Sequence, residues 1–366
     1  MANKKTAEPE ITVMMMGARR VGKTSMLASM YNSFNTVAAG TNLIMSKKGG
    51  IQIDDARYFM DSLFKESHMA LDPLGWIDGD GTPSFDEIDF ELSISGKGNN
   101  SPKKSIRFID CAGEWFNEHS NEDDFKEKLE NCEAVIIAVD SVLLMENHGA
   151  HQRMNAPVAV TEYIKNYFNP DAMTNSKKMV IFVPTKCEKY MNLHENPNSA
   201  FYGKKMSELT RRIKEEYKEL FDFLECPANK SLFTVAIMPA ITLGGIEFDQ
   251  FAPEAKGGDL CTNEILYRYC KECKYKPRYC EFPLLYTLLF VNQKIAKHYY
   301  ETAYKNGKKK LGVKISEWFD KKRNLTTDPE FIAELNKVAQ KLQSYPGFEL
   351  VQDPDGIAKT VQPPRK

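Results

Sequence analysis

The decisive stretch of this sequence is Gly17-Ala18-Arg19-Arg20-Val21-Gly22-Lys23-Thr24, an uninterrupted match to the pattern G-x-x-x-x-G-K-[ST]. It follows an apolar, β-prone run at residues 11–16 and precedes residues 25–33, which have helical apolar spacing. Between a strand and a helix, such glycines let backbone N–H groups surround phosphate oxygens, while the lysine reaches the β- and γ-phosphates and the threonine binds Mg²⁺. We therefore predict a phosphate-binding loop with contacts from Gly17, Arg19, Arg20, Val21, Gly22, Lys23, Thr24 and Ser25.

A second motif follows another apolar strand. Residues 105–110 lead into Cys111-Ala112-Gly113-Glu114, so that a D-x-x-G motif begins at the strand end with Asp110. Downstream of a phosphate loop, this arrangement predicts that Asp110 meets Mg²⁺ through water and that the Gly113 amide faces the γ-phosphate.

A third motif indicates which base is bound. The strand at 134–140 is apolar on both faces, as a central parallel strand is, and a further apolar strand at 179–184 leads into Thr185-Lys186-Cys187-Glu188. Here the chain resembles the GTPases of the Ras-like, or translation-factor-related, class, whose [NT]-K-x-D motif stands at the end of such a strand. The resemblance implies that Lys186 packs along the purine and that a carboxylate, here Glu188 in place of Asp, accepts hydrogen bonds from guanine. By position alone, Ala236 in the strand 232–237 would donate the backbone amide that this family directs at the base.

The same resemblance predicts the remaining metal ligand. Family members place a Mg²⁺-binding Thr just before a strand that pairs antiparallel with the D-x-x-G strand. Residues 85–94 alternate in polarity and turn back toward 106–109, so Thr82 is the expected ligand beside Thr24 and Asp110. Thr41 and Thr36, which lie nearer to the loop in sequence, are the alternatives. This choice implies a helical insertion at about residues 45–80, with a helix at 53–69.

The candidates for catalysis are Lys23, Arg20 and Glu114. Hydrolysis of GTP requires an oriented water and positive charge near the transition state. Glu114 stands where Ras-like members carry a water-orienting Gln, and it adds negative charge beside the γ-phosphate. Arg20 occupies the loop position at which guanylate-binding and atlastin-like GTPases carry an internal arginine finger. The alternative for Arg20 is exposure to solvent or an ion pair with Glu114 or Asp110.

Composition limits the other functions. A chain of 366 residues with 42% hydrophobic content exceeds one ordinary domain and supports a sizeable core. Since 49 basic residues balance 50 acidic ones, no net field favours nucleic acid. The N-terminus has no apolar signal-peptide region, and no run is long enough to span a membrane. We expect a cytoplasmic protein with no nucleic-acid partner and no stable membrane insertion.

The eight cysteines are then not expected to form structural disulfides. Four of them, Cys261, Cys270, Cys273 and Cys280, cluster in sequence, and the spacing of the middle pair is that of zinc ligands. However, the outer spacings fit no standard zinc pattern, and tyrosines interleave with the cysteines. Buried thiols are therefore favoured over a zinc site.

The expected organisation is a flexible tail at 1–10, a P-loop GTPase domain at 11–250, a mostly helical extension at 251–345 and a disordered tail at 346–366. Residues 244–258 have the composition of a loop. Helices are predicted at 158–168, 207–223, 284–304 and 328–345.

The motif order predicts a P-loop NTPase fold of three layers, α/β/α, with a mostly parallel sheet and a helical C-terminal extension. Residues 279–286 are also similar to bacterial GTPase-like proteins of conflict or stress gene neighbourhoods.

The predicted function is a Mg²⁺-dependent GTPase that binds GTP and GDP as a molecular switch for an unidentified protein effector. The oligomeric state is left open, a nucleotide-dependent dimer included. One alternative is an ATPase, which would keep the loop and Asp110 but use Lys186 and Glu188 structurally. The other is a nucleotide-binding scaffold or switch with little hydrolysis.

Overall fold

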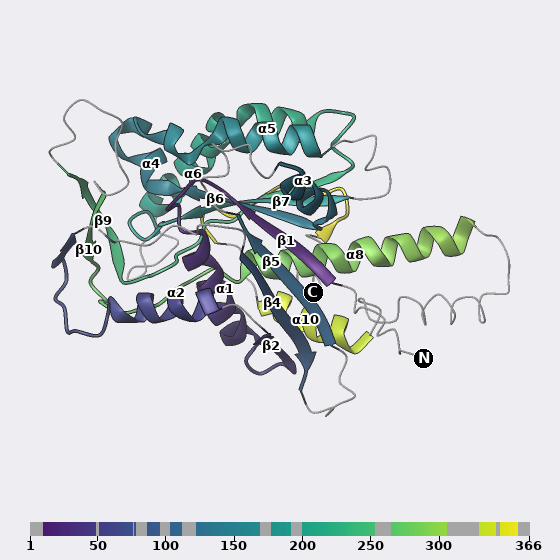
Figure 1. Cartoon of the computed structure of the whole chain (residues 1–366), viewed down its shortest axis with the longest axis horizontal. Coiled ribbons are helices and arrows are strands. Elements are labelled where there is room, and N and C mark those ends of the chain that lie inside the picture. Colours follow the sequence, from purple (N-terminus) through teal and green to yellow (C-terminus); the bar gives the residue numbers. More distant parts are fainter. Residues whose placement is uncertain are drawn as a thin grey trace.

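A computed structural model describes residues 10–48, 51–75, 77, 86–95, 103–111, 122–168, 177–191, 200–252, 265–305, 329–341 and 345–357. Its centre is an eight-stranded sheet with the order β11-β8-β7-β6-β1-β5-β4-β2 (Figure 1). The strands are β1 (Glu10–Met16), β2 (Leu43–Lys47), β4 (Asp86–Ile94), β5 (Lys103–Asp110), β6 (Ala134–Asp140), β7 (Lys178–Thr185), β8 (Phe233–Ile237) and β11 (Glu349–Gln352).

The middle of the sheet is parallel: β5, β1, β6, β7 and β8 all run the same way. Every residue of β6 and β7 is buried, as expected for parallel strands covered on both faces. The strand β4 pairs antiparallel with β5, and β2 adds to it on the outside. The predicted α/β fold with its mostly parallel sheet is therefore confirmed, including the antiparallel strand before the D-x-x-G strand.

Helices cover both faces of this sheet. In Figure 1, α1, α2, α8 and α10 lie on one side, whereas α3, α4, α5 and α6 lie on the other. Among the described residues, no helix combines the length and the apolar character needed to cross a bilayer. The helices are α1 (Lys23–Ala38), α2 (Ile51–Ser62), α3 (Glu122–Asn131), α4 (Ser141–Met145), α5 (Pro157–Tyr167), α6 (Ala200–Glu216), α7 (Lys218–Glu225), α8 (Phe282–Lys305) and α10 (Pro329–Lys341).

Two helices differ from the sequence prediction. The helix expected at 53–69 ends at Ser62, because the chain then crosses to a second sheet. The Tyr269 hydroxyl of that sheet donates to the Leu63 carbonyl at 2.6 Å, which gives a partner to a carbonyl left open at the helix end. The helix expected at 207–223 is broken into α6 and α7 at Tyr217, whose buried hydroxyl donates to the Asn155 carbonyl.

The second sheet has three antiparallel strands, β3 (Pro73–Gly75), β10 (Ile265–Tyr269) and β9 (Ile246–Phe251). The strand β9 lies where the sequence predicted a loop, at 244–258. Gly244 has a φ of +81°, and a Cβ there would stand 2.2 Å from the Lys276 carbonyl oxygen. The glycines that suggested a loop instead permit a close approach of two backbones next to a strand.

The predicted disordered tail at 346–366 is wrong for its first part. The strand β11 pairs antiparallel with β8 and completes the main sheet, and Ile357 is fully buried. Aromatic packing holds this segment, since the Tyr345 ring stacks on that of Tyr279 with centroids 4.0 Å apart. Residues 358–366 lie outside the described residues, as do residues 1–9 of the tail predicted at 1–10, whose last residue, Glu10, begins β1. The division at residue 250 into a GTPase domain and an extension stays a prediction.

The burial of Ile357 gives a test of this correction. Ile357→Ala should lower the free energy of unfolding by about 2–4 kcal/mol, because a buried isoleucine loses its packing. The same substitution at Ile44, which is 46% exposed, should cost less than about 1 kcal/mol. Denaturant unfolding of both variants measures the difference, and equal, small effects would mean that the segment around 357 is not packed.

Candidate nucleotide-binding site

The predicted phosphate loop connects β1 to α1 in the expected strand–loop–helix arrangement. Three of its residues have positive φ: Gly17 at +141°, Arg20 at +62° and Gly22 at +94°. A Cβ on Gly17 would stand 2.6 Å from the Ala138 carbonyl oxygen of β6, so the loop can follow its path only with glycine there. Arg19 is exposed and Arg20 is half-buried. Their roles toward phosphate stay predictions.

Lys23 lies inside this loop. Its side chain is 6% exposed, and its amine donates to the carbonyl oxygens of Gly17 and Ala18, each at 2.9 Å. Burial lowers the pKa of the Lys23 amine, while the nearby Asp110 carboxylate acts in the opposite direction. A cation is thus held at the N-terminus of α1, where backbone N–H groups and the helix dipole also favour an anion.

The two described metal-ligand candidates meet. The Thr24 hydroxyl donates to Oδ2 of Asp110 at 2.7 Å. Asp110 is the last residue of β5 and is fully buried, whereas Thr24 and Ser25 belong to the first turn of α1. A hydroxyl beside a carboxylate is an oxygen donor set that suits Mg²⁺.

The structure argues against both alternatives for the third metal ligand. Thr36 lies twelve residues after Thr24 on α1 and therefore about 18 Å along the helix axis from it. Thr41 follows the end of this helix, and its hydroxyl donates to the Ala38 carbonyl. Neither alternative reaches Asp110. Thr82, the preferred ligand, lies outside the described residues, as do Gly113 and Glu114, so their roles stay predictions.

The T-K-x-E segment follows β7 at the same edge of the sheet. The Thr185 hydroxyl donates to the Val21 carbonyl at 2.6 Å and to the Val139 carbonyl at 3.2 Å. It therefore joins the phosphate loop to the ends of β6 and β7. Lys186 comes next, in a left-handed backbone conformation with a φ of +55°.

The Lys186 amine forms an ion pair with Asp140, at 2.5 Å from Oδ2. The ring of Tyr267, from β10 of the second sheet, has its centroid 5.8 Å from the same amine. Burial acts against the charged form, but the Asp140 carboxylate and the Tyr267 phenol outweigh it and raise the pKa of Lys186 above its usual value.

Glu188 is buried and already has hydrogen-bond donors. Its Oε1 accepts from the backbone N–H groups of Leu243 at 2.9 Å and Gly244 at 3.2 Å. Burial raises the pKa of this carboxyl, and the backbone donors oppose that effect. The carboxylate thus holds the loop after β8 against the loop after β7.

The position assigned to Ala236 is wrong. Ala236 lies inside β8, where it is paired with Ile181 of β7 and with Leu350 of β11. It is the penultimate residue of this strand and fully buried, so its amide lies within the sheet. The loop that meets the T-K-x-E segment lies further along the chain, at Leu243 and Gly244, and sequence reasoning missed it because Ala236 was chosen by position alone.

The cysteines of the expected cluster have local partners. Cys280 is buried and donates through Sγ to the Ile241 carbonyl at 3.1 Å, and Cys273 donates to the Cys270 carbonyl at 3.1 Å. Cys261 lies outside the described residues. Among the described side chains, no three or more of His, Cys, Asp and Glu gather closely enough to hold a metal ion.

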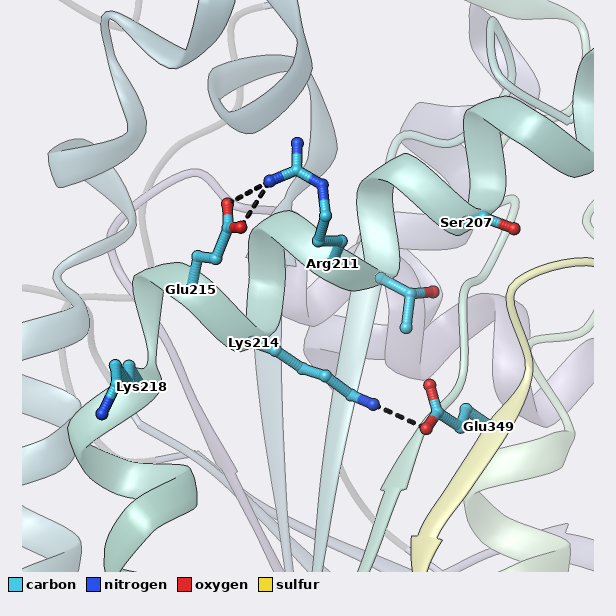
Figure 2. A pocket seen from close by; sticks show the side chains of 7 residues that line it. Ser207, Arg211, Lys214, Glu215, Lys218 and Glu349 are labelled. Carbon is cyan, nitrogen blue, oxygen red and sulfur yellow. Dashed lines mark hydrogen bonds and ion pairs between the residues drawn. The ribbon is translucent and has the colours of Figure 1, made fainter.

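A groove lies elsewhere on the molecule, between α6 and β11 (Figure 2). It has a volume of about 480 Å³ and contains none of the predicted site residues. Its charges are paired: Lys214 contacts Glu349 at 2.6 Å, and Arg211 contacts Glu215. These ion pairs are exposed side-chain contacts of the kind that contribute little to stability or binding.

Comparisons with known proteins add only a distant likeness. No model of a protein family and no curated protein matches the sequence. Among solved structures, the chain is similar to the S. cerevisiae Ski7 GTPase-like domain bound to GDP and inorganic phosphate, with 13% identity and a TM-score of 0.32. It is also similar to that domain bound to GTP, with 12% identity and a TM-score of 0.30. Each match covers 69% of this chain and 48% of the other, so the chain spans about half the length of these structures.

Asp140 and Tyr267 are further site residues that sequence reasoning missed. Asp140 carried a signal, since an Asp that ends an apolar central strand lies at the edge where ligands of parallel sheets bind. No sequence signal indicated Tyr267, because its position beside Lys186 depends on the β9–β10 pairing, which the sequence analysis did not predict.

The close approach of Gly17 to the Ala138 carbonyl can be tested by comparing an alanine substitution at Gly17 with one at Gly203. Gly17→Ala should lower the free energy of unfolding by about 2 kcal/mol or more, because the new methyl group meets a strand carbonyl and the φ is unfavourable. Gly203→Ala, in α6 with no atom within 4 Å of the new Cβ, should raise stability by about 0.5 kcal/mol. Denaturant unfolding compares the two, and a harmless Gly17→Ala would contradict the loop geometry.

Proposed function

We propose that this protein is a Mg²⁺-dependent guanine-nucleotide-binding protein that hydrolyses GTP and acts as a molecular switch. The observation that carries the proposal is the 2.7 Å hydrogen bond between Thr24 and Asp110 beside the buried amine of Lys23. Two oxygen ligands and one cation thus stand at the N-terminus of α1, the combination that a Mg²⁺–phosphate group requires.

In this proposal each part of the loop has a role. The backbone N–H groups of residues 17–25 and the Lys23 amine bind the β- and γ-phosphates. Thr24 and Asp110 hold Mg²⁺, with Thr82 as the third protein ligand. Gly113 contacts the γ-phosphate.

Hydrolysis would then depend on Arg20 and Glu114. Arg20 supplies positive charge to the transition state from within the loop, and Glu114 orients the attacking water. Lys186 and Glu188 recognise the base. The cycle of GTP and GDP would control an as yet unidentified protein effector, through a monomer or a nucleotide-dependent dimer.

The cytoplasm is the location that we propose. All seven described cysteines are free thiols, and five of them are buried. Thiols persist in a reducing compartment, where GTP is also available.

A second candidate function is hydrolysis of ATP. It is favoured by the contacts of Glu188, whose Oε1 is engaged by the Leu243 and Gly244 amides, and by the ion pair between Lys186 and Asp140. These are the structural uses of the two residues that an ATPase would make. The GTP proposal requires the second carboxylate oxygen of Glu188 to face the base.

Titration of labelled GTP and ATP against the purified protein, with Mg²⁺ and with EDTA, tests the proposal, and phosphate release then measures hydrolysis. Preferred, Mg²⁺-dependent binding and turnover of GTP support it. A preference for ATP supports the second candidate. Binding of GTP without release of phosphate supports a switch or scaffold with little hydrolysis.

Lys23→Ala should weaken GTP binding by about 1.5–3 kcal/mol, because a buried charge-assisted contact to phosphate is lost. Lys214→Ala, in the groove of Figure 2, is the matched control and should leave the affinity unchanged. Isothermal titration calorimetry measures both. Undiminished GTP affinity in Lys23→Ala would refute a phosphate-binding role for the loop.

Glu188→Gln separates recognition of guanine from a structural role. The amide oxygen still accepts from Leu243 and Gly244, so the fold is retained, but the negative charge is lost. If Glu188 binds guanine, the preference for GTP over ATP should fall by about 10- to 100-fold. Glu146→Gln, whose carboxylate accepts from Tyr190 instead, is the control. An unchanged preference in competition binding would leave Glu188 with a structural role only.

A further inference from the structure

The base side of the candidate site contains a polar cluster in which the proposed function uses only Lys186. It consists of Lys186, Asp140 and Tyr267, which come from the loop after β7, the end of β6 and β10. The Lys186 amine is the shared member: Asp140 contacts it at 2.5 Å, and the Tyr267 ring lies 5.8 Å from it. The Tyr267 phenol also contributes to the raised pKa of Lys186.

Asp140 is held firmly in place. Its Oδ1 accepts from the Val142 N–H at 2.9 Å and so caps α4, while Oδ2 faces Lys186. Its backbone is fixed by Asn155, whose side chain accepts from the Asp140 N–H at 2.7 Å and donates to the Asp140 carbonyl at 3.2 Å. Because these hydrogen bonds fix the Asp140 carboxylate, its position determines where the Lys186 amine lies.

Tyr267 is anchored by the second sheet. Next to it on that sheet, Phe248 and Ile265 are buried against Val142 and Leu143 of α4, and Tyr267 packs against the same cluster. The β9–β10 pair therefore lies over the chain that follows β6, and it brings a residue distant in sequence to the end of β7. Nothing in the strand order of the main sheet requires this contact.

Lys186 itself is held in an unfavourable conformation. A φ of +55° is uncommon for a residue with a side chain, and it persists only where the surroundings compensate for the strain. Three contacts hold the segment: Thr185 to the phosphate loop, Glu188 to the loop after β8, and the Lys186 amine to Asp140. Strain maintained in this way is typical of residues that contact a ligand.

We propose that Asp140 and Tyr267 are positioning residues that hold the Lys186 side chain along the purine of a bound nucleotide, so that base affinity depends on the β9–β10 pair. The proposal rests on the proposed function, since it requires a purine nucleotide in the phosphate loop. The Lys186 amine is held by Asp140 beside the Tyr267 ring, so the aliphatic part of the Lys186 side chain is already ordered in the absence of a base. Binding then avoids the entropy cost of ordering a free lysine side chain.

The test compares two ligands, GDP and inorganic pyrophosphate, both with Mg²⁺, in Tyr267→Phe and Asp140→Asn. The first variant keeps the ring and removes the hydroxyl. The second removes the charge but keeps an oxygen that can cap α4. Each should weaken GDP binding by about tenfold, because the Lys186 amine loses a polar partner, and leave pyrophosphate affinity unchanged. Pyrophosphate does not contain a base, so the ratio of the two affinities isolates the base side.

Tyr190→Phe is the matched control. Tyr190 lies in the loop after β7, like Lys186, but its hydroxyl donates to Glu146 at 2.8 Å. Its ratio of GDP to pyrophosphate affinity should equal that of the unmodified protein, and thermal melting verifies that every variant is folded. The inference is overturned if Tyr267→Phe and Asp140→Asn leave this ratio unchanged, or if they weaken both ligands equally. A protein that binds neither GDP nor ATP before any substitution refutes the proposed function instead.

Discussion

The hydrogen bond between Thr24 and Asp110 joins the first turn of α1 to the end of β5, and the candidate site is arranged around this junction. It forms because β1 and β5 are parallel neighbours with Met15 opposite Asp110, so the chain that leaves β1 passes the end of β5. On the other side of β1, Gly17 approaches the carbonyl of Ala138 on β6. A parallel sheet thus brings three strand ends and one helix N-terminus to a single edge, where a phosphate and its metal can be bound together.

The base side is built differently. There, the charged side chains have partners within the protein: Lys186 forms an ion pair with Asp140, and Glu188 accepts hydrogen bonds from two backbone N–H groups. Each partner lies on another segment, so these contacts also hold the loops after β6, β7 and β8 together. Lys186 and Glu188 therefore have structural roles, and a single substitution can affect these together with the recognition roles proposed for them. Conservative changes, which keep the hydrogen-bond geometry, are needed to separate those roles.

The C-terminal part of the chain completes the main fold. The helix α8 buries Leu284, Leu285, Leu288 and Leu289 in the core, and β11 pairs with β8. At the opposite edge, Glu334 of α10 accepts from the Asn42 N–H at 2.9 Å, just before β2. The β2 edge is further covered by Asn35, whose side chain accepts from the Met45 N–H at 3.3 Å. The β2 edge of the sheet is thus partly closed by side-chain contacts that limit pairing with another chain.

The amino-acid sequence by itself determined the strand–loop–helix unit at residues 17–24, the strand before Asp110 and the two central strands. These features depend on local patterning: apolar runs, glycines and a motif of fixed spacing. Tertiary structure decided the break at Tyr217, the small sheet, the packing of the chain up to Ile357 and the contact of Glu188 with the loop at Leu243 and Gly244. It alone placed Tyr267 beside Lys186. The physical reason is that these outcomes depend on pairing and burial between segments far apart in the chain, for which local periodicity carries no information.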